Sequence, residues 1–163
     1  SPAAEFQFRA EEQQRLIHEM GLGVKFQLGT YEPERFFALA KGHEAEPEGG
    51  ERCFKCYRLR LEEAARAAKA GGFSYFTTTL SISPHKNAQV LNELGKEISD
   101  TFGVPYLYSD FKKKNGYRRS CELSTEYHLY RQDYCGCPFS KAEAEERKRR
   151  VQACATHTKE RKS

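Results

Sequence analysis

Two pairs of cysteines carry the reactive chemistry of this sequence. Cys53 and Cys56 lie three positions apart in ERCFKCY, where the helical pattern of a following segment begins. On the first turn of a helix both thiols can point the same way, and the helix N-terminus favours thiolate, the form that binds metal or attacks. This pair could therefore be a redox dithiol, half of a zinc site, or part of an iron–sulfur ligand set.

The second pair, Cys135 and Cys137, flanks a single glycine in YCGCPFS. A disulfide across one residue closes a very small ring and should be easily reduced, whereas two thiolates could chelate one metal. Chance proximity is the third interpretation. A zinc ribbon places its second cysteine pair about 12–20 residues after the first. Cys56 and Cys135 are much farther apart, so the sequence favours a site assembled by tertiary folding.

Two other segments offer weaker candidates. His85 follows a predicted strand, where a catalytic or phosphate-binding group would lie in a parallel sheet, although a capped turn with an exposed histidine explains it equally well. The segment FKKKNGYRR (111–119) mixes cations with an aromatic ring, which suits RNA backbone and bases, and a solvated loop is the alternative. Its cations are Lys112, Lys113, Lys114, Arg118 and Arg119.

The elements that must position these residues alternate between helix-like and strand-like patterns. Helices are predicted over 11–20, 33–41, 53–70, 91–102, 120–131 and 140–150, and strands over 24–31, 73–82 and 104–110. Such alternation predicts βαβ units and therefore an α/β fold with a parallel sheet. Ser140 and Glu143 form a capping-box pattern for the last helix. We expect one domain over 1–154 and a basic, flexible tail over 155–163.

Composition and charge narrow the function classes. The 163 residues are 38% apolar and 31% charged. Residues 1–82 hold 11 Lys/Arg against 12 Asp/Glu, and residues 83–163 hold 16 against 11, so the second half has a net charge of +5. A basic half can attract phosphates, and a solvated tail also accounts for it. No apolar run approaches the ~18 residues of a membrane span, and no signal peptide is visible, so we expect a cytoplasmic protein without a membrane partner.

Four stretches together resemble a known family. ERCFKCYRLRLEEAA, FTTTLSISPHKN, VPYLYSDFKKKNGY and LYRQDYCGCPFS, in this order, are similar to epoxyqueuosine reductases of the QueH type. The resemblance covers residues 5–140. It implies a HUP-like (Rossmann-like, adenine nucleotide α-hydrolase-like) fold and an oxidoreductase of queuosine biosynthesis. This enzyme would convert epoxyqueuosine to queuosine at the wobble position of tRNA with a GUN anticodon, using an external electron donor.

The resemblance also implies roles for the cysteines. The family's 4Fe-4S cluster is held by two adjacent N-terminal cysteines and by the two that correspond to Cys53 and Cys56. Cys135 and Cys137 correspond to its redox-active disulfide, and an additional iron is associated with the site. No Cys-Cys occurs in this sequence. We therefore expect an N-terminal truncation, with two ligands and the first strand of the sheet upstream of Ser1.

Two other classes of protein remain open from the residues alone. One is a thiol-disulfide oxidoreductase that acts on proteins, which a CxxC at a helix start would suit. The other is a non-enzymatic RNA-binding module stapled by zinc. Metal content separates them: iron with labile sulfide indicates the reductase, one zinc indicates the module, and a reversible dithiol without metal indicates the oxidoreductase.

Overall fold

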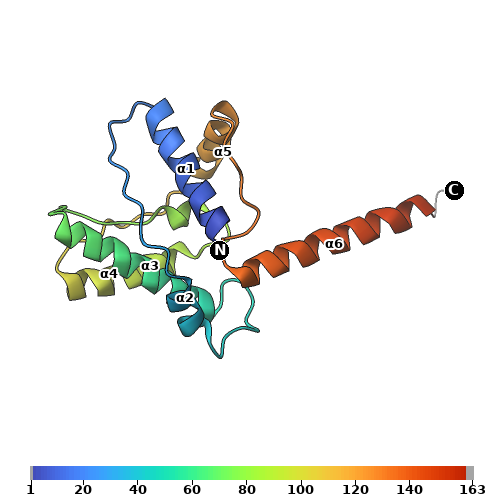
Figure 1. The fold of residues 1–163 in the computed structure, drawn as a ribbon, viewed down its shortest axis with the longest axis horizontal. Coiled ribbons are helices and arrows are strands. Elements are labelled where there is room, and N and C mark those ends of the chain that lie inside the picture. Colours follow the sequence, from blue (N-terminus) through green and yellow to red (C-terminus); the bar gives the residue numbers. More distant parts are fainter. Residues whose placement is uncertain (1, 161–163) are drawn as a thin grey trace. The chain divides into compact units, whose positions relative to one another are not determined.

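Helices provide nearly all of the regular structure. The computed structural model describes residues 2–160, and side chains through Gln152. The elements in chain order (Figure 1) are α1 (Ala3–Glu19), α2 (Pro33–Ala40), α3 (Glu51–Ala70), the short 3-10 helix η1 (Thr79–Ile82), α4 (Ala88–Phe102), α5 (Gly116–Glu126) and α6 (Pro138–Glu160). The helices predicted from apolar spacing are confirmed as elements, although α1 and α5 begin earlier than expected and α6 continues past residue 150.

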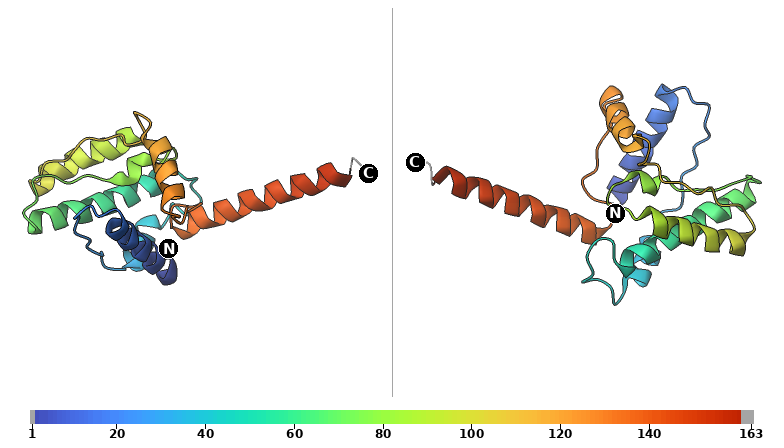
Figure 2. Two further views of the ribbon diagram at one scale, coloured as in Figure 1. Left: turned by 90° about the horizontal axis from the view of Figure 1, so that it is seen from above. Right: turned by 180° about the vertical axis from the view of Figure 1, so that it is seen from behind.

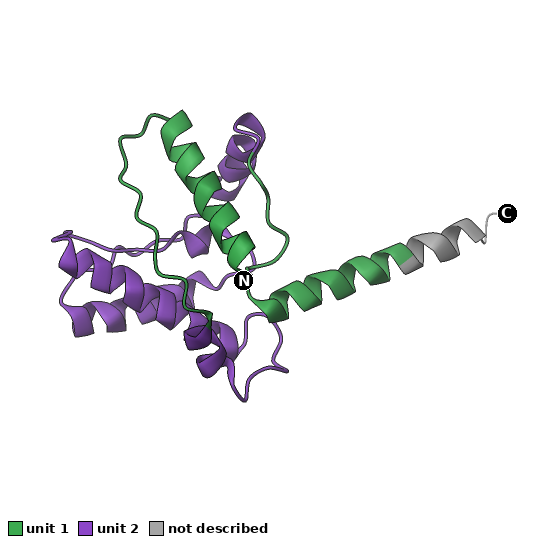
Figure 3. Ribbon diagram, viewed as in Figure 1, with its two compact units in different colours: residues 1–33, 129–163 green, residues 34–128 purple. Residues whose placement is uncertain are grey.

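The chain divides into two compact units, coloured separately in Figure 3. Unit 1 combines residues 1–33 with 129–163, and unit 2 is residues 34–128. Each unit is described by itself. The single domain expected over 1–154 therefore stays a prediction, and the tail expected over 155–163 lies outside the residues whose side chains are described.

The hydrophobic core of unit 2 lies between α3 and α4, which run side by side (Figures 1 and 2). Tyr57, Leu61 and Ala65 recur every four residues along α3, so they share one buried face. Leu91 and Ile98 of α4 are 0% and 1% exposed and pack into the same core. Burial of one such side chain contributes about 1.5–3 kcal/mol, so packing of these faces is the main source of stability in unit 2.

The ends of α4 follow from its sequence. The Asn87 side chain accepts hydrogen bonds from the backbone N–H groups of Gln89 and Val90 at the start of the helix. Gly103 ends it with a φ of 71°, a left-handed conformation that glycine adopts without steric cost. Between these ends, Gly95 allows close packing, because a Cβ at this position would lie 2.5 Å from ring carbons of Tyr106.

The prediction of a parallel-sheet, HUP-like α/β fold is wrong for this structure. Within residues 2–160 the only β pairing is one isolated parallel bridge, between Phe76 and Tyr106. The segment 24–31 is irregular, and the second half of the strand predicted over 73–82 is the helix η1. Aromatic and β-branched residues favour strands when they fit onto a pleated, half-buried surface. Two short segments that pair only with each other provide too little of that surface for a regular ladder.

The last helix is polar along most of its length. Ala144 is buried, whereas the residues from 147 to 152 are exposed. Ion pairs between side chains one turn apart, such as Lys141 with Glu145 and Arg150 with Glu146, lie along its surface. No helix in the described part of the chain is long and apolar enough to cross a membrane.

Candidate functional site: two cysteine pairs

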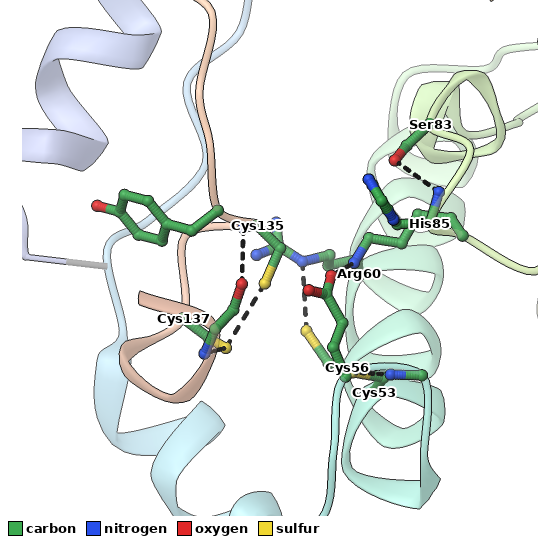
Figure 4. A network of polar contacts seen from close by, with 12 residues as sticks. Cys53, Cys56, Arg60, Ser83, His85, Cys135 and Cys137 are labelled. Atoms are coloured by element: carbon green, nitrogen blue, oxygen red, sulfur yellow. Dashed lines mark hydrogen bonds and ion pairs between the residues drawn. The ribbon is translucent and has the colours of Figure 1, made fainter. Parts of the chain in front are cut away.

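The loop that joins Cys135 to Cys137 brings their sulfur atoms together. Gly136 has a φ of 108°, a conformation that side chains rarely tolerate, and it turns the chain back on itself. The two sulfur atoms lie 3.5 Å apart, and no disulfide joins them (Figure 4). Cys137 is buried, with 9% of its surface exposed, whereas Cys135 is more accessible. The loop therefore presents a preformed dithiol.

Ser140 contacts both cysteines of this loop. Its hydroxyl oxygen accepts a hydrogen bond from the backbone N–H of Cys135, at 3.1 Å, and its own N–H donates to the sulfur of Cys137, at 3.3 Å. The sequence predicted Ser140 as the capping residue at the start of the last helix. In the structure α6 begins two residues earlier, at Pro138, and Ser140 is inside the first turn. Proline suits the first helical position, because its missing N–H would lack a helical partner there.

Arg9 of α1 binds the backbone that leads into the same loop, within unit 1. Its guanidinium donates to the carbonyl oxygens of Tyr134 and Cys135, each at 3.4 Å, and lies 5.0 Å from the Tyr134 ring centroid. Glu5 pairs with the same guanidinium at 2.7 Å. Burial raises the pKa of Tyr134 above its ordinary value, and the nearby Glu5 carboxylate acts in the same direction. The pattern of the sequence gave no indication of this role for Arg9.

Cys53 lies on the first turn of α3 and Cys56 on the second, because the helix begins at Glu51, two residues before its predicted start. The sulfur of Cys53 is buried and accepts a hydrogen bond from the Gly49 N–H at 3.3 Å. The sulfur of Cys56 accepts from the Arg60 guanidinium at 3.5 Å (Figure 4). N–H donors, a cation and the helix N-terminus all stabilise thiolate over thiol. This end of α3 is therefore suited to hold two thiolate ligands.

Arg52, next to the first cysteine, has a structural role that the sequence did not indicate. Its side chain is 1% exposed and turned into the preceding loop. One terminal nitrogen donates to the backbone carbonyls of His43, Glu44 and Glu46, at 2.6–3.1 Å. Arg52 thereby fixes the polar loop that leads into Cys53.

A buried polar cluster lies next to this cysteine pair in unit 2. The ammonium of Lys86 is 8% exposed, pairs with Glu48 at 2.5 Å and lies 6.0 Å from the centroid of the Tyr57 ring. Burial raises the pKa of Tyr57 to about 12, opposed in part by the Lys86 charge. His85, the predicted catalytic candidate, is exposed, and its backbone N–H is bound by the Ser83 hydroxyl. The catalytic role of His85 stays a prediction. Its neighbour Lys86 is the residue whose side chain is buried in unit 2.

The basic loop that follows residue 110 divides into inward and outward cations. Lys112 donates to the carbonyl oxygens of Ser81 and Lys86, at 3.3 and 3.4 Å, and pairs with Asp110. The Lys113 side chain is 78% exposed. Arg118 and Arg119 also face solvent, on the first turn of α5, where both pair with Glu122. Beside Lys113 is an open hollow of about 430 Å³, with Asn92, Lys96 and Tyr108 in its lining.

A four-thiolate cluster site is not complete in the residues that are described. No group of three or more His, Cys, Asp or Glu side chains close enough to hold a metal ion occurs in the described part of the chain. Cys53 and Cys56 fit as one two-thiolate edge of a metal centre. They do not supply the four ligands of a 4Fe-4S cluster.

Comparison with known proteins identifies the family of this chain. The family model for epoxyqueuosine reductase QueH matches residues 1–143, a range that includes all four cysteines. This chain belongs to the QueH family. The epoxyqueuosine reductase QueH of Staphylococcus epidermidis is 43% identical over 145 residues, and that of Streptococcus pyogenes is 43% identical over 143 residues. The QueH of Thermotoga maritima is 33% identical over 147 residues.

The extent of these matches bears on what can be transferred from the QueH relatives. They cover 85%, 85% and 90% of this chain, respectively. They cover 61% of the Staphylococcus protein, 56% of the Streptococcus protein and 77% of the Thermotoga protein. The chain thus spans little more than half the length of the first two QueH relatives. The activity of these relatives is therefore a proposal for this chain.

Proposed function

We propose that this chain is an epoxyqueuosine reductase, which converts epoxyqueuosine to queuosine at the wobble position of tRNA in the last step of queuosine biosynthesis. The observation that carries the proposal is the family match over residues 1–143, which retains both cysteine pairs. Removal of an epoxide oxygen as water consumes two electrons and two protons. A dithiol that becomes a disulfide releases two electrons and two protons, so Cys135 and Cys137 match the stoichiometry.

We further propose that Cys53 and Cys56 bind iron. Their thiolates would form one edge of a 4Fe-4S cluster whose other ligands lie outside the described residues. Some of these thiols would also bind an additional iron. A cluster of this kind supplies electrons one at a time from an external donor. This chain's own residues contribute a donor to each sulfur, the Gly49 N–H to Cys53 and the Arg60 guanidinium to Cys56.

One assay tests the reaction. The protein is incubated anaerobically, with ferrous iron, sulfide and dithionite, with a GUN-anticodon tRNA that carries epoxyqueuosine, and the digested nucleosides are analysed by mass spectrometry. We expect queuosine to form, and we expect the Cys135→Ser/Cys137→Ser variant to lose at least about 100-fold in rate, because removal of residues that take part in the chemical step typically costs this much or more. Cys121→Ser is the matched control, since Cys121 lies outside both pairs.

Metal content in the same preparations separates the alternatives. Bound iron that falls to background in Cys53→Ser/Cys56→Ser supports the proposed ligands. Stoichiometric zinc with no queuosine formed would indicate a metal-stapled RNA-binding module. Turnover of protein disulfides without metal and without queuosine would indicate a thiol-disulfide oxidoreductase.

We propose that the outward cations Lys113, Lys114, Arg118 and Arg119 contact the phosphates of the tRNA. The exposure of these side chains and the hollow next to Lys113, with the Tyr108 ring in its lining, support this surface. A cytoplasmic location would place the protein with this substrate. Lys112 is engaged inside unit 2 and gives a matched comparison within the same loop.

The salt dependence of tRNA binding tests this surface. Each lost phosphate contact should reduce the slope of log K against log salt concentration by about 0.7–0.9. Lys113→Ala/Lys114→Ala should therefore lower the slope by about 1.5, whereas Lys112→Ala should lower the thermal stability and leave the slope nearly unchanged. Equal slopes for the wild type and the double variant would contradict the assignment.

A further inference from the structure

The sulfur of Cys137 occupies the position of a helix-capping atom. The carbonyl oxygen of Cys137 accepts the N–H of Lys141 at 3.1 Å, which is the first hydrogen bond of α6. Its sulfur accepts the N–H of Ser140, the third residue of the helix, at 3.3 Å. These are the two contacts of a capping residue, in which a side-chain oxygen normally accepts the second bond.

The two sulfurs of the dithiol therefore lie in different surroundings. Cys137 is 9% exposed, lies at the positive end of α6 and accepts a backbone donor. The sulfur of Cys135 is more accessible and lies 3.5 Å from that of Cys137, close enough for the two to share one proton. One proton between two sulfurs would thus stay on Cys135.

Ser140 maintains this difference through two separate groups. Its backbone N–H serves Cys137, and its hydroxyl oxygen holds the backbone of Cys135 at 3.1 Å, with the serine only 3% exposed. The charged side chains near the loop in unit 1 include Arg9 with its partner Glu5, Asp133 with its partner Lys148, and Lys141 with its partner Glu145. Each of these charges is paired with an opposite one, so the difference between the two sulfurs comes from the backbone donor and the start of α6.

We propose that Cys137 is the resident thiolate of the pair, that Cys135 retains the thiol proton, and that Ser140 is the positioning residue that establishes this order. The inference deepens the proposed reductase function, because it identifies Cys135 as the accessible thiol that faces a substrate. In the overall reaction the pair then supplies two electrons and one proton, and the second proton of the released water comes from solvent. Alkylation of the pair requires neither tRNA nor iron, so the inference can fail while the proposed function stands.

The experiment measures alkylation of each cysteine as a function of pH. The reduced protein is pulsed with iodoacetamide, which forms a carbon–sulfur bond and releases iodide, and the labelled peptides are quantified by mass spectrometry. Cys135→Ser and Cys137→Ser each leave one thiol of the pair, so that each midpoint belongs to one sulfur. The midpoint, unlike the rate, does not depend on how accessible the sulfur is.

We expect Cys137 in the Cys135→Ser variant to show a midpoint at least one pH unit below that of Cys135 in the Cys137→Ser variant. Ser140→Pro removes the N–H, in a first helical turn that tolerates proline, and should raise the midpoint of Cys137 by about one unit. Ser140→Ala keeps the N–H and should shift it by less than half as much, and Ser140→Thr, which keeps both groups, should restore the wild-type value. Equal or reversed midpoints for the two cysteines would overturn the proposal, as would equal effects of proline and alanine at position 140.

Discussion

Replacement of Arg52 by methionine is expected to lower the free energy of unfolding by about 3 kcal/mol or more. The buried guanidinium donates to the carbonyl oxygens of His43, Glu44 and Glu46, and methionine would leave these acceptors without that donor. A hydrogen bond to a charged donor contributes about 1.5–3 kcal/mol, so the loss of these contacts accounts for a change of this size. Urea unfolding followed by far-ultraviolet circular dichroism measures the change.

Arg58→Met is the control for this experiment. Arg58 lies on the same helix and pairs with Glu97, but its side chain is 44% exposed. An exposed ion pair of this kind contributes at most about 1 kcal/mol. Similar urea midpoints for the two variants would show that the carbonyl contacts of Arg52 do not hold the loop before Cys53.

The free energy of unfolding of the wild type should fall at high pH because of Tyr57. Replacement of Tyr57 by phenylalanine should abolish this fall. Burial of the ring raises the pKa of Tyr57 to about 12, while the unfolded chain ionises near 10. The folded state thus retains its proton where the unfolded state has lost it. The contribution of Tyr57 to the free energy of unfolding is therefore fully present below pH 10. It falls by about 2 kcal/mol as the pH rises to 12.

The same substitution should be favourable at neutral pH. The Tyr57 hydroxyl is buried and has no hydrogen-bond partner among the described residues, so its removal should add about 1 kcal/mol of stability. Urea midpoints between pH 8 and 11.5, compared with the wild type, measure both effects. Tyr75→Phe, on a ring that is 61% exposed, is the control. A constant difference between Tyr57→Phe and the wild type across this range would contradict the prediction.

The helices could be predicted from sequence because their signals are local. The apolar spacing along 53–70 and 91–102 and the glycines that follow each run depend on neighbours within four residues. The strands could not be predicted in the same way. Segment 24–31 has the composition of a strand, but a strand also requires a neighbour to pair with, and its composition contains no information about that neighbour.

The candidate site was predicted in part, for the same reason. Spacing alone placed Cys53 and Cys56 on one helical turn. The roles of Arg52 and Lys112 depend on carbonyl groups brought near by folding, so both cations resembled surface residues in the sequence. Ser140 was assigned to a cap because serine commonly has that role, whereas the atom in the capping position is the sulfur of Cys137.

The capping contact of Cys137 also couples the dithiol to the helix that follows it. By thermodynamic linkage, the free energy by which α6 favours a charged sulfur equals the free energy by which that charge favours the first turn of α6. Any reaction that neutralises the sulfur, whether protonation or oxidation, therefore lowers the stability of the first turn of α6 by the same free energy. The redox state of two adjacent side chains is therefore transmitted to a long backbone element as a change in its stability.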